Sequence, residues 1–521
     1  MYDILIKNAK IIDGTGAKIT KSNILINQGI IEFISKDTDY KTKITIDADN
    51  LLLTPGFIDV NNHSDTSLTI FNQSKLKSLA SQGITTIIGG NCGGSLAPLS
   101  GIDSLKSIQK WTNLSKININ WNSVKEYYEI LEKNKLYLNY STLIGYSTVR
   151  RGLLKDEIRP LLDTELDYIQ KFIERGLNQG ALGVSVGLSF THSHLIDKTE
   201  LLLLAQILKK HKKILTFHLR DESEHIIGAI QEVIDIVRQT GVNTEISHLK
   251  ILGKKNWKYF DEVYNMLSHT IDQDKLPIKF DIFPYNYNNG VLYIHLPKWL
   301  TKNGRYDMLK ELHNIEVRKK VIAEMKMNNV DYSSMVISQF REGKNFVKKT
   351  IQEISKNQEV SIEESILNLI IASEGGVKVM INSINDIHIK KFIINKNSII
   401  STDGVGYDDT FFEKNLYDHP RCFYSMPKYI NNYVGKDLSL EQAIAKITSI
   451  PAKHYGIQNR GLIKEGFIAD INLINMSLFQ KNIDFDKVRK YQSGIEYQII
   501  SGKFSIKEGK FIDYPNGKII R

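Results

Sequence analysis

A cysteine, two histidines and an aspartate each close a short apolar run that is typical of a buried β-strand: Cys92, His218, His248 and Asp403. Taken singly, a histidine at a strand end is usually structural, a cysteine is usually a small buried hydrophobe, and an aspartate before glycine is usually a turn residue. Taken together, one thiolate and two imidazoles suit Zn²⁺, with a carboxylate beside them. Three protein ligands leave a fourth position open for water, which is typical of a catalytic zinc site.

Other polar residues follow the same kind of run. Asn61 and His63 stand two residues apart at the end of the first run, so they lie on one face of a strand. Arg220 and Lys250 have the same spacing from the two strand-end histidines, and Tyr285 ends a further run. Two glycines on either side of Asn91-Cys92 allow close backbone approach or unusual dihedral angles.

These residues meet only if the strands that carry them share one sheet. The middle of the chain alternates helix-like stretches with glycine-bounded apolar runs near residues 56–61, 84–92, 138–146, 181–188, 213–219, 243–249, 278–285 and 398–403. Eight strands alternating with helices favour an α/β fold of the (β/α)8 TIM-like barrel type over an open doubly wound sheet. In such a barrel the carboxyl ends of the strands share one face, where active sites lie.

The two ends of the chain have a different residue pattern, in which β-forming residues are interrupted by tight turns. We therefore predict a small β-sandwich domain built from residues 1–54 and 456–521 around a hydrolase barrel of residues 55–455. The seventh and eighth runs are far apart, and a structureless loop of that length is improbable. This interval predicts an inserted, lid-like subdomain at 286–350.

Composition bounds the class of protein. The 521 residues are 42% hydrophobic and 24% charged, which permits a sizeable core and excludes wholesale disorder. Two cysteines exclude a disulfide-rich scaffold. The absence of a cationic leader and of a long apolar run predicts a cytoplasmic protein without a membrane partner. The net charge of +10 comes from 68 basic residues spread among 58 acidic ones, so we expect solvated faces and no nucleic-acid partner.

Almost end to end, the chain resembles the N-acyl-D-amino-acid deacylases, or D-aminoacylases, of the amidohydrolase superfamily. The Asn-Cys-Gly and Ser-His-x-Lys elements are fairly specific to this branch, whereas the tail is shared more widely. The motifs that carry the resemblance are Pro55-Gly-Phe-Ile-Asp-Val, Gly90-Asn-Cys-Gly-Gly-Ser, Gly180-Ala-Leu-Gly-Val-Ser, His218-Leu-Arg-Asp-Glu, Ser247-His-Leu-Lys, Phe283-Pro-Tyr, Ser401-Thr-Asp-Gly, His419-Pro-Arg and the tail from Thr448 to Asp470.

The resemblance implies a barrel, a β-sandwich from both termini, an inserted lid and a zinc ion held tightly by Cys92, His218 and His248. It also implies a second, weaker metal position formed by an His-x-His pair and the late aspartate. Here that pair reads Asn61-Asn62-His63, so His63 remains as a ligand while its partner is an amide. An amide oxygen binds zinc less well than imidazole does. We therefore predict one tight zinc ion and a second position that is weak or empty.

The resemblance implies hydrolysis of the amide bond of small N-acyl-D-amino acids, releasing a carboxylate and a free D-amino acid. Asp403 would be the general base, with or without help from His63. Lys250, Tyr285 and Arg421 match the family positions that bind the substrate α-carboxylate, and Arg220 is a further candidate for this contact.

Two departures from the family pattern leave alternatives open. Residues 190–194 replace a common Tyr-Pro-Pro, and their His192 and His194 either contact substrate or are solvated loop residues. Together with Asn61, this change leaves another amidohydrolase reaction as an alternative, such as cyclic amide or D-dipeptide hydrolysis. A catalytically degenerate barrel that acts as a binding protein is a further alternative.

Overall fold

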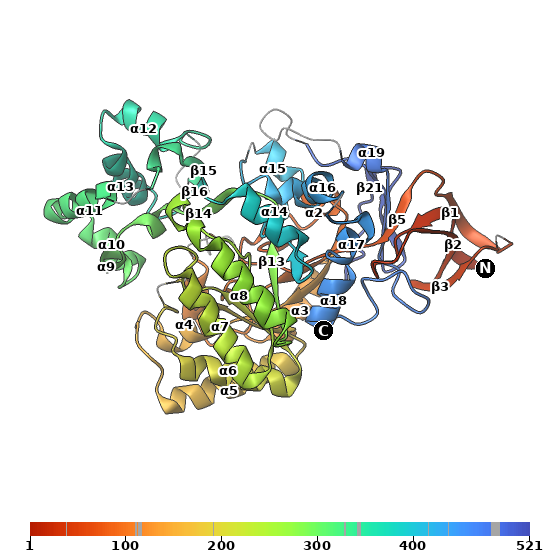
Figure 1. Ribbon diagram of the computed structural model, residues 1–521, viewed down its shortest axis with the longest axis horizontal. Coiled ribbons are helices and arrows are strands. Elements are labelled where there is room, and N and C mark those ends of the chain that lie inside the picture. The colour runs from red at the N-terminus through yellow and green to blue at the C-terminus, as the bar shows by residue number, and fades with distance from the viewer. Residues whose placement is uncertain are drawn as a thin grey trace.

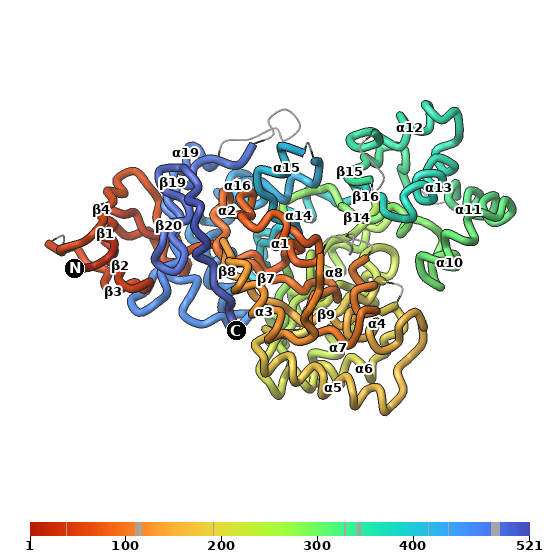
Figure 2. Tube along the Cα trace, turned by 180° about the vertical axis from the view of Figure 1, so that it is seen from behind, coloured from red at the N-terminus to blue at the C-terminus, as the bar shows by residue number. Residues whose placement is uncertain are grey.

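The computed structural model describes residues 1–37, 39–109, 112, 117–190, 192–327, 330–340, 345–414, 416–435, 437–480 and 490–521. Three regions follow one another along its longest axis (Figure 1). A β-rich region from both chain ends lies at one end, parallel strands with helices occupy the middle, and a mainly helical region lies at the other end. Figure 2 shows the same order from behind.

Parallel strands fill the middle region, and each predicted apolar run contains at least one of them. One set joins β6 (Phe57–Asp59), β7 (Ile84–Gly89) and β8 (Asn139–Thr142). A second set runs in the order β9 (Ile144–Gly145), β10 (Gly183–Gly187), β11 (Ile214–His218), β12 (Asn243–Ile246), β13 (Ile278–Ile282) and β17 (Ser398–Ile400). A parallel bridge between Asn62 and Gly404 connects the ends of β6 and β17. The outer strands of the two sets therefore meet, which is consistent with a barrel.

Burial patterns explain why these segments form a covered parallel sheet. Every residue of β7 and β10 is buried, as expected for strands that are enclosed on both faces. Amphipathic helices connect the later strands: α5 (Asp163–Asn178), α6 (Lys198–His211), α7 (Ile226–Thr240), α8 (Phe260–Asp272) and α14 (Asp386–Ile394). Helix α7 buries Ile230, Val233 and Val237 along one stripe and ends at Thr240, because the following Gly241 adopts a left-handed conformation that stops the helix.

Further α-helices lie in the middle region and its connections. In chain order they are α1 (Thr69–Asn72), α2 (Lys77–Ala80), α3 (Val124–Lys133), α4 (Tyr146–Leu154), α15 (Thr410–Glu413), α16 (Arg421–Tyr433), α17 (Leu440–Ala445), α18 (Ser449–Tyr455) and α19 (Met476–Phe479). Among the described residues, no helix combines the length and apolar character that a membrane span needs.

Both chain ends contribute to one nine-stranded sheet. The N-terminal strands are β1 (Tyr2–Ile11), β2 (Thr20–Asn27), β3 (Ile30–Ser35), β4 (Thr42–Asp47) and β5 (Leu52–Pro55), and the C-terminal strands are β18 (Ile471–Ile474), β19 (Ile495–Ile500), β20 (Lys503–Lys507) and β21 (Lys510–Phe511). Antiparallel pairing of β5 with β18 joins the two ends, and a separate apolar cluster lies beneath these strands. The two ends of the chain therefore share one sheet.

The region inserted between β13 and β17 has its own sheet and core. Antiparallel strands lie in the order β14 (Tyr287–Val291), β16 (Val377–Asn382) and β15 (Val336–Phe340). Helices α9 (Lys298–Thr301), α10 (Arg305–Glu311), α11 (Ile315–Met327), α12 (Ile351–Gln358) and α13 (Ile362–Ala372) accompany them, with an apolar cluster that spans Leu292 to Ile381. This folded unit extends past residue 350, because its central strand β16 comes last in the chain.

Candidate active site

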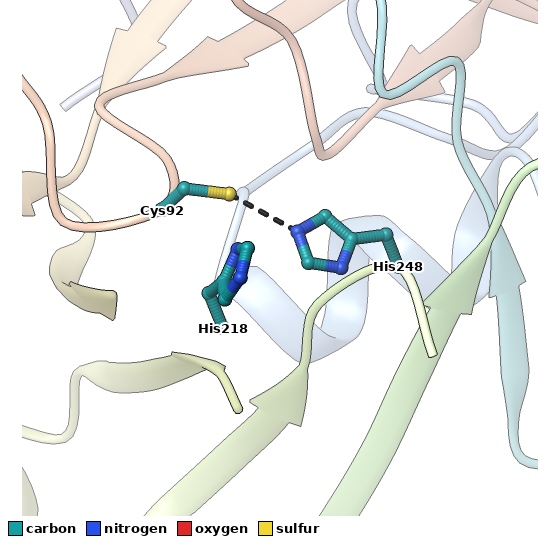
Figure 3. A group of neighbouring side chains, drawn as sticks. All are labelled: Cys92, His218 and His248. Atoms are coloured by element: carbon teal, nitrogen blue, oxygen red, sulfur yellow. Dashed lines mark hydrogen bonds between the residues drawn. The ribbon is translucent and has the colours of Figure 1, made fainter. Parts of the chain in front are cut away.

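Three distant segments bring a thiol and two imidazoles together. Cys92 follows β7, His218 ends β11 and His248 follows β12, and their candidate ligand atoms all lie within 4.8 Å of one another. Figure 3 shows the side chains directed toward a common point, with Cys92 Sγ 3.2 Å from His248 Nε2. Thiolate sulfur and imidazole nitrogen are the usual protein ligands of zinc, so this donor set fits a single Zn²⁺ ion.

The cysteine is held in a strained, glycine-lined turn. Its φ angle is +53°, a left-handed conformation that non-glycine residues rarely adopt. A Cβ atom added at Gly90 would lie 2.0 Å from the Leu143 carbonyl oxygen, and one added at Gly93 would lie 2.8 Å from the Gly187 amide nitrogen. Glycine is needed at both positions because neighbouring backbone approaches so closely.

We expect Gly90→Ala to destabilise the protein and to disturb the Cys92 loop. The added methyl group meets a backbone carbonyl in the buried interior, and φ is +74°, so strain alone costs about 1–3 kcal/mol before the clash is counted. Thermal unfolding and zinc titration would measure the two effects. Gly228→Ala is the matched control, because this exposed glycine of α7 has open space around it and alanine favours helix by about 0.5–1 kcal/mol. Equal melting temperatures for Gly90→Ala and the unchanged protein would contradict this account.

The electrostatics of the cluster favour a thiolate. Burial would raise the pKa of Cys92, but the charge of His248 and hydrogen bonds from His218, His248 and His63 outweigh it and hold the pKa well below its ordinary value. A deprotonated sulfur is the form that binds a metal ion. The cluster therefore favours the thiolate form of Cys92, which can bind a cation.

A buried carboxylate orients one of the imidazoles. Glu222 Oε1 lies 3.1 Å from His248 Nδ1 and accepts a 2.6 Å hydrogen bond from Lys250 Nζ. Burial would raise the pKa of Glu222, yet the charges of Lys250, His218 and His248 hold it below its ordinary value. Because Nδ1 is engaged in this way, His248 presents Nε2 to the cluster, an arrangement common behind metal-binding histidines.

Asp403 follows β17 and is held between two cations. Its Oδ1 lies 3.1 Å from His63 Nε2, and its Oδ2 accepts a 2.5 Å hydrogen bond from Arg421 Nη1. Burial would raise the pKa of Asp403, but the charges of Arg421, His248 and His63 outweigh it and lower the pKa. Burial would lower the pKa of His63, while Asp403 and Cys92 raise it to about 10. Asp403 is therefore ionised at neutral pH.

One cavity of about 330 Å³ contains the cluster and most of the predicted contacts. Its lining includes His63, Asp403, Arg220, Lys250 and Arg421 together with the cysteine and two histidines. The Arg421 guanidinium also lies 4.7 Å from the centre of the Phe283 ring, which restricts its orientation. Lys250 and Arg421 thus line the same cavity as the cluster.

Two predicted substrate contacts are placed differently. Tyr285 does not line the cavity, and its ring instead forms a T-shaped contact with His419 at a centroid distance of 5.1 Å. Arg220 lines the cavity, but its guanidinium donates to Glu232 and to the carbonyl oxygens of His194 and Ile196. These contacts brace the chain between β10 and α6. The geometry therefore favours a structural role for Arg220.

The histidines at 192 and 194 lie outside the cavity that contains the cluster. His192 is partly buried beside Arg151 and lines a neighbouring cavity, whereas His194 is exposed. This placement favours the interpretation of both as loop residues. Asn61 is fully buried and donates to Asp281 at 3.2 Å, while its Oδ1 has no hydrogen-bond partner among the described residues.

Some residues of the site escape sequence reasoning. Glu222 belongs to the His-Leu-Arg-Asp-Glu motif, and its spacing of four from His218 was the available signal. Ser189 lies 2.9 Å from His218 Nε2 and has no such signal. Lys378 and Asp418 also line the cavity, and only the position of the inserted sheet brings the lysine there.

The sequence profile described as "Amidohydrolase family" matches residues 52–503. The chain is also similar to three curated proteins of Alcaligenes xylosoxydans xylosoxydans. A D-aminoacylase is 23% identical, with 100% of this chain and 97% of the relative covered. An N-acyl-D-aspartate deacylase is 24% identical over 96% and 91%, and an N-acyl-D-glutamate deacylase is 23% identical over 96% and 93%.

Solved structures show the same fold. A D-aminoacylase superposes with a TM-score of 0.84 at 21% identity, and 100% of both chains is covered. An N-acyl-D-glutamate deacylase from Bordetella bronchiseptica, complexed with zinc and a phosphonate inhibitor that mimics the tetrahedral intermediate, gives 0.82 at 22% identity, covering 100% of this chain and 99% of the other. An L-hydantoinase from Arthrobacter aurescens gives 0.57 at 16% identity over 100% of both chains.

Proposed function

The chain belongs to the amidohydrolase family, and we propose that it hydrolyses the amide bond of N-acyl-D-amino acids with one tightly bound zinc ion. The observation that carries the proposal is the convergence of Cys92, His218 and His248 beside Asp403 in one cavity. Similarity along the whole chain to three deacylases of N-acyl-D-amino acids supports the substrate class. The higher TM-scores for the deacylases than for the hydantoinase favour a linear over a cyclic amide.

The proposal includes an architecture that positions the site. Residues 55–455 form a (β/α)8 barrel, and residues 1–54 and 456–521 form a small β-sandwich domain. The insertion between the seventh and eighth barrel strands is lid-like and continues to β16 rather than ending at 350. The parallel pairings and the bridge between Asn62 and Gly404 support the barrel. A cytoplasmic location and the absence of nucleic-acid partners remain predictions.

Each polar group of the cavity has a part in the proposed reaction. Cys92, His218 and His248 would hold a zinc ion, which would supply Lewis acidity toward the scissile carbonyl and the attacking water. Asp403 takes the proton of that water as general base and later returns it to the departing amine. His63 and Arg421 hold the Asp403 carboxylate in place through its two oxygens.

The α-carboxylate of the substrate needs cationic donors within the same cavity. We assign this contact to Lys250 and Arg421, because both line the cavity beside the cluster. Tyr285 and Arg220 are weaker candidates, since one lies outside the lining and the other is bound by Glu232 and backbone carbonyls. A guanidinium group is well matched to a planar carboxylate.

We further propose that a second metal position is weak or empty. The family position that would carry a second histidine holds Asn61, whose amide nitrogen is bound by Asp281. A neutral amide oxygen is a poorer zinc ligand than imidazole. His63 and Asp403 therefore lack the third strong donor that a tightly held second ion requires.

A chiral panel of substrates tests the proposed function on protein of measured zinc content. We expect about one zinc per chain, hydrolysis of N-acetyl-D-amino acids, and rates at least about a hundredfold lower for their L-enantiomers, because a pocket that orients polar groups rejects a mismatched arrangement. Chelation should abolish the activity and zinc should restore it.

Other results of the substrate panel and the zinc analysis would favour the alternative functions or contradict the proposal. Opening of cyclic amides without hydrolysis of linear ones would indicate a different amidohydrolase reaction. No hydrolysis of any substrate after zinc supplementation would indicate a binding protein on a degenerate barrel. Two firmly held zinc ions per chain would contradict the assignment of a weak second position.

A further inference from the structure

One face of the inserted sheet is polar and lies toward the cavity that contains Cys92, His218 and His248. In its central strand β16, Val377, Val379 and Ile381 belong to the apolar core of the insertion. Side chains alternate between the two faces of a strand, so Lys378 lies on the opposite face. Lys378 is partly buried and lines the cavity together with the cysteine and the two histidines.

Asp418 connects this polar face to the wall of the cavity through hydrogen bonds. Its carboxylate accepts 3.2 Å hydrogen bonds from Asn289 Nδ2 of β14 and from Gln339 Nε2 of β15, and a further bond from the Tyr407 hydroxyl. Gln339 is the register partner of Lys378 in the neighbouring strand. These bonds hold the sheet against the segment that leads to Arg421. The position of Lys378 over the cavity is therefore determined by packing rather than by a mobile loop.

Three other cations that line the cavity contact protein carboxylates. Lys250 donates to Glu222 at 2.6 Å, Arg421 donates to Asp403 at 2.5 Å, and Arg220 is bound by Glu232. Lys378 likewise has a carboxylate, that of Asp418, acting on its charge. Burial lowers its pKa, and Arg421 adds to this effect, although Asp418 and Cys422 act in the opposite direction. A carboxylate entering the cavity would stabilise this ammonium group, since a nearby negative charge favours the charged form.

We propose that Lys378 binds a side-chain carboxylate of the substrate, so that the protein prefers N-acyl derivatives of D-aspartate or D-glutamate. This inference rests on the proposed deacylase function and specifies its substrate class. A dicarboxylic substrate carries two anionic groups, and the cavity offers cations from separate elements. Lys250 follows β12 and Arg421 begins α16, whereas Lys378 comes from the inserted sheet. Two relatives are named for acidic D-amino acids, so acidic substrates are compatible with this kind of fold.

Comparing kcat/KM for N-acetyl-D-glutamate, N-acetyl-D-aspartate and N-acetyl-D-leucine tests the proposal. The unchanged protein should favour the better acidic substrate over the leucine derivative by at least about tenfold. Lys378→Met should lower kcat/KM for that acidic substrate by about thirtyfold or more and leave the leucine derivative within about threefold, because one partner of a buried charge pair is lost only for the acidic substrate. Lys302→Met removes an equal charge from an exposed position of the insertion and should leave the preference intact.

Three outcomes would overturn the assignment. Equal losses for acidic and apolar substrates in Lys378→Met would mean that the lysine binds the α-carboxylate or serves the structure. A wild-type preference for the leucine derivative would reject the substrate class while leaving the deacylase function in place, and this comparison holds even where the variant fails to fold. Failure of the zinc-loaded protein on all three substrates would reject the proposed function together with this inference.

Discussion

Asp403→Asn should lower kcat by about 10²- to 10⁴-fold while zinc stays bound, the range that general acid–base catalysis contributes. The amide keeps the size of the carboxylate but cannot accept a proton from water at neutral pH. Asp403 already carries its negative charge, because Arg421, His248 and His63 hold its pKa below the ordinary value against the opposing effect of burial. Steady-state rates and zinc analysis on the same preparation measure both halves of the prediction.

Asp409→Asn provides the comparison for this variant. Asp409 lies on the chain after the same strand and forms a partly exposed ion pair with Lys77. Loss of an exposed pair typically costs no more than about 1 kcal/mol, so activity should persist. Wild-type turnover by Asp403→Asn would remove this residue from the role of base. Loss of zinc together with activity would instead assign it to metal binding.

Cys92→Ala should remove the tightly held zinc and the activity that depends on it. The sulfur is the one soft donor of the cluster, and its pKa is held low by His248 and by hydrogen bonds from His218, His248 and His63 against the effect of burial. Without it, two imidazoles remain, fewer than the three protein ligands that catalytic zinc sites use. Bound zinc should fall from about one equivalent toward zero, as measured by elemental analysis after dialysis.

The second cysteine offers a matched control. Cys422 is also buried, and its sulfur accepts a hydrogen bond from the Val405 amide at 3.3 Å. Burial raises the pKa of Cys422 well above its ordinary value, so its sulfur stays a thiol and is poorly suited to bind a cation. Cys422→Ala should therefore keep its zinc. Unchanged zinc content in Cys92→Ala would show that Cys92 is not a zinc ligand.

The resemblance to D-aminoacylases is confirmed by the comparisons, and the strand pattern behind it is visible in the structure. Runs ending at Cys92, His218 and His248 form strands of parallel sets, and their ends converge. These strands lie in two parallel sets that meet at the bridge between Asn62 and Gly404, so strand-end residues far apart in the chain become neighbours. The boundary of the insertion was less visible, because β16 follows helices that separate it from the strands it joins.

The residue types that stand at the strand ends can be predicted from the amino-acid sequence alone, and they predict a thiolate, two imidazoles and an aspartate at one site. The partners of the charged groups can be seen only in the folded protein. Arg220 is bound by Glu232 from helix α7, while Tyr285 turns to His419. Lys378 reaches the cavity through a sheet that Asp418 holds in place. Strand ends follow from local patterns of apolar residues, whereas the partner of a long polar side chain depends on how separate elements pack.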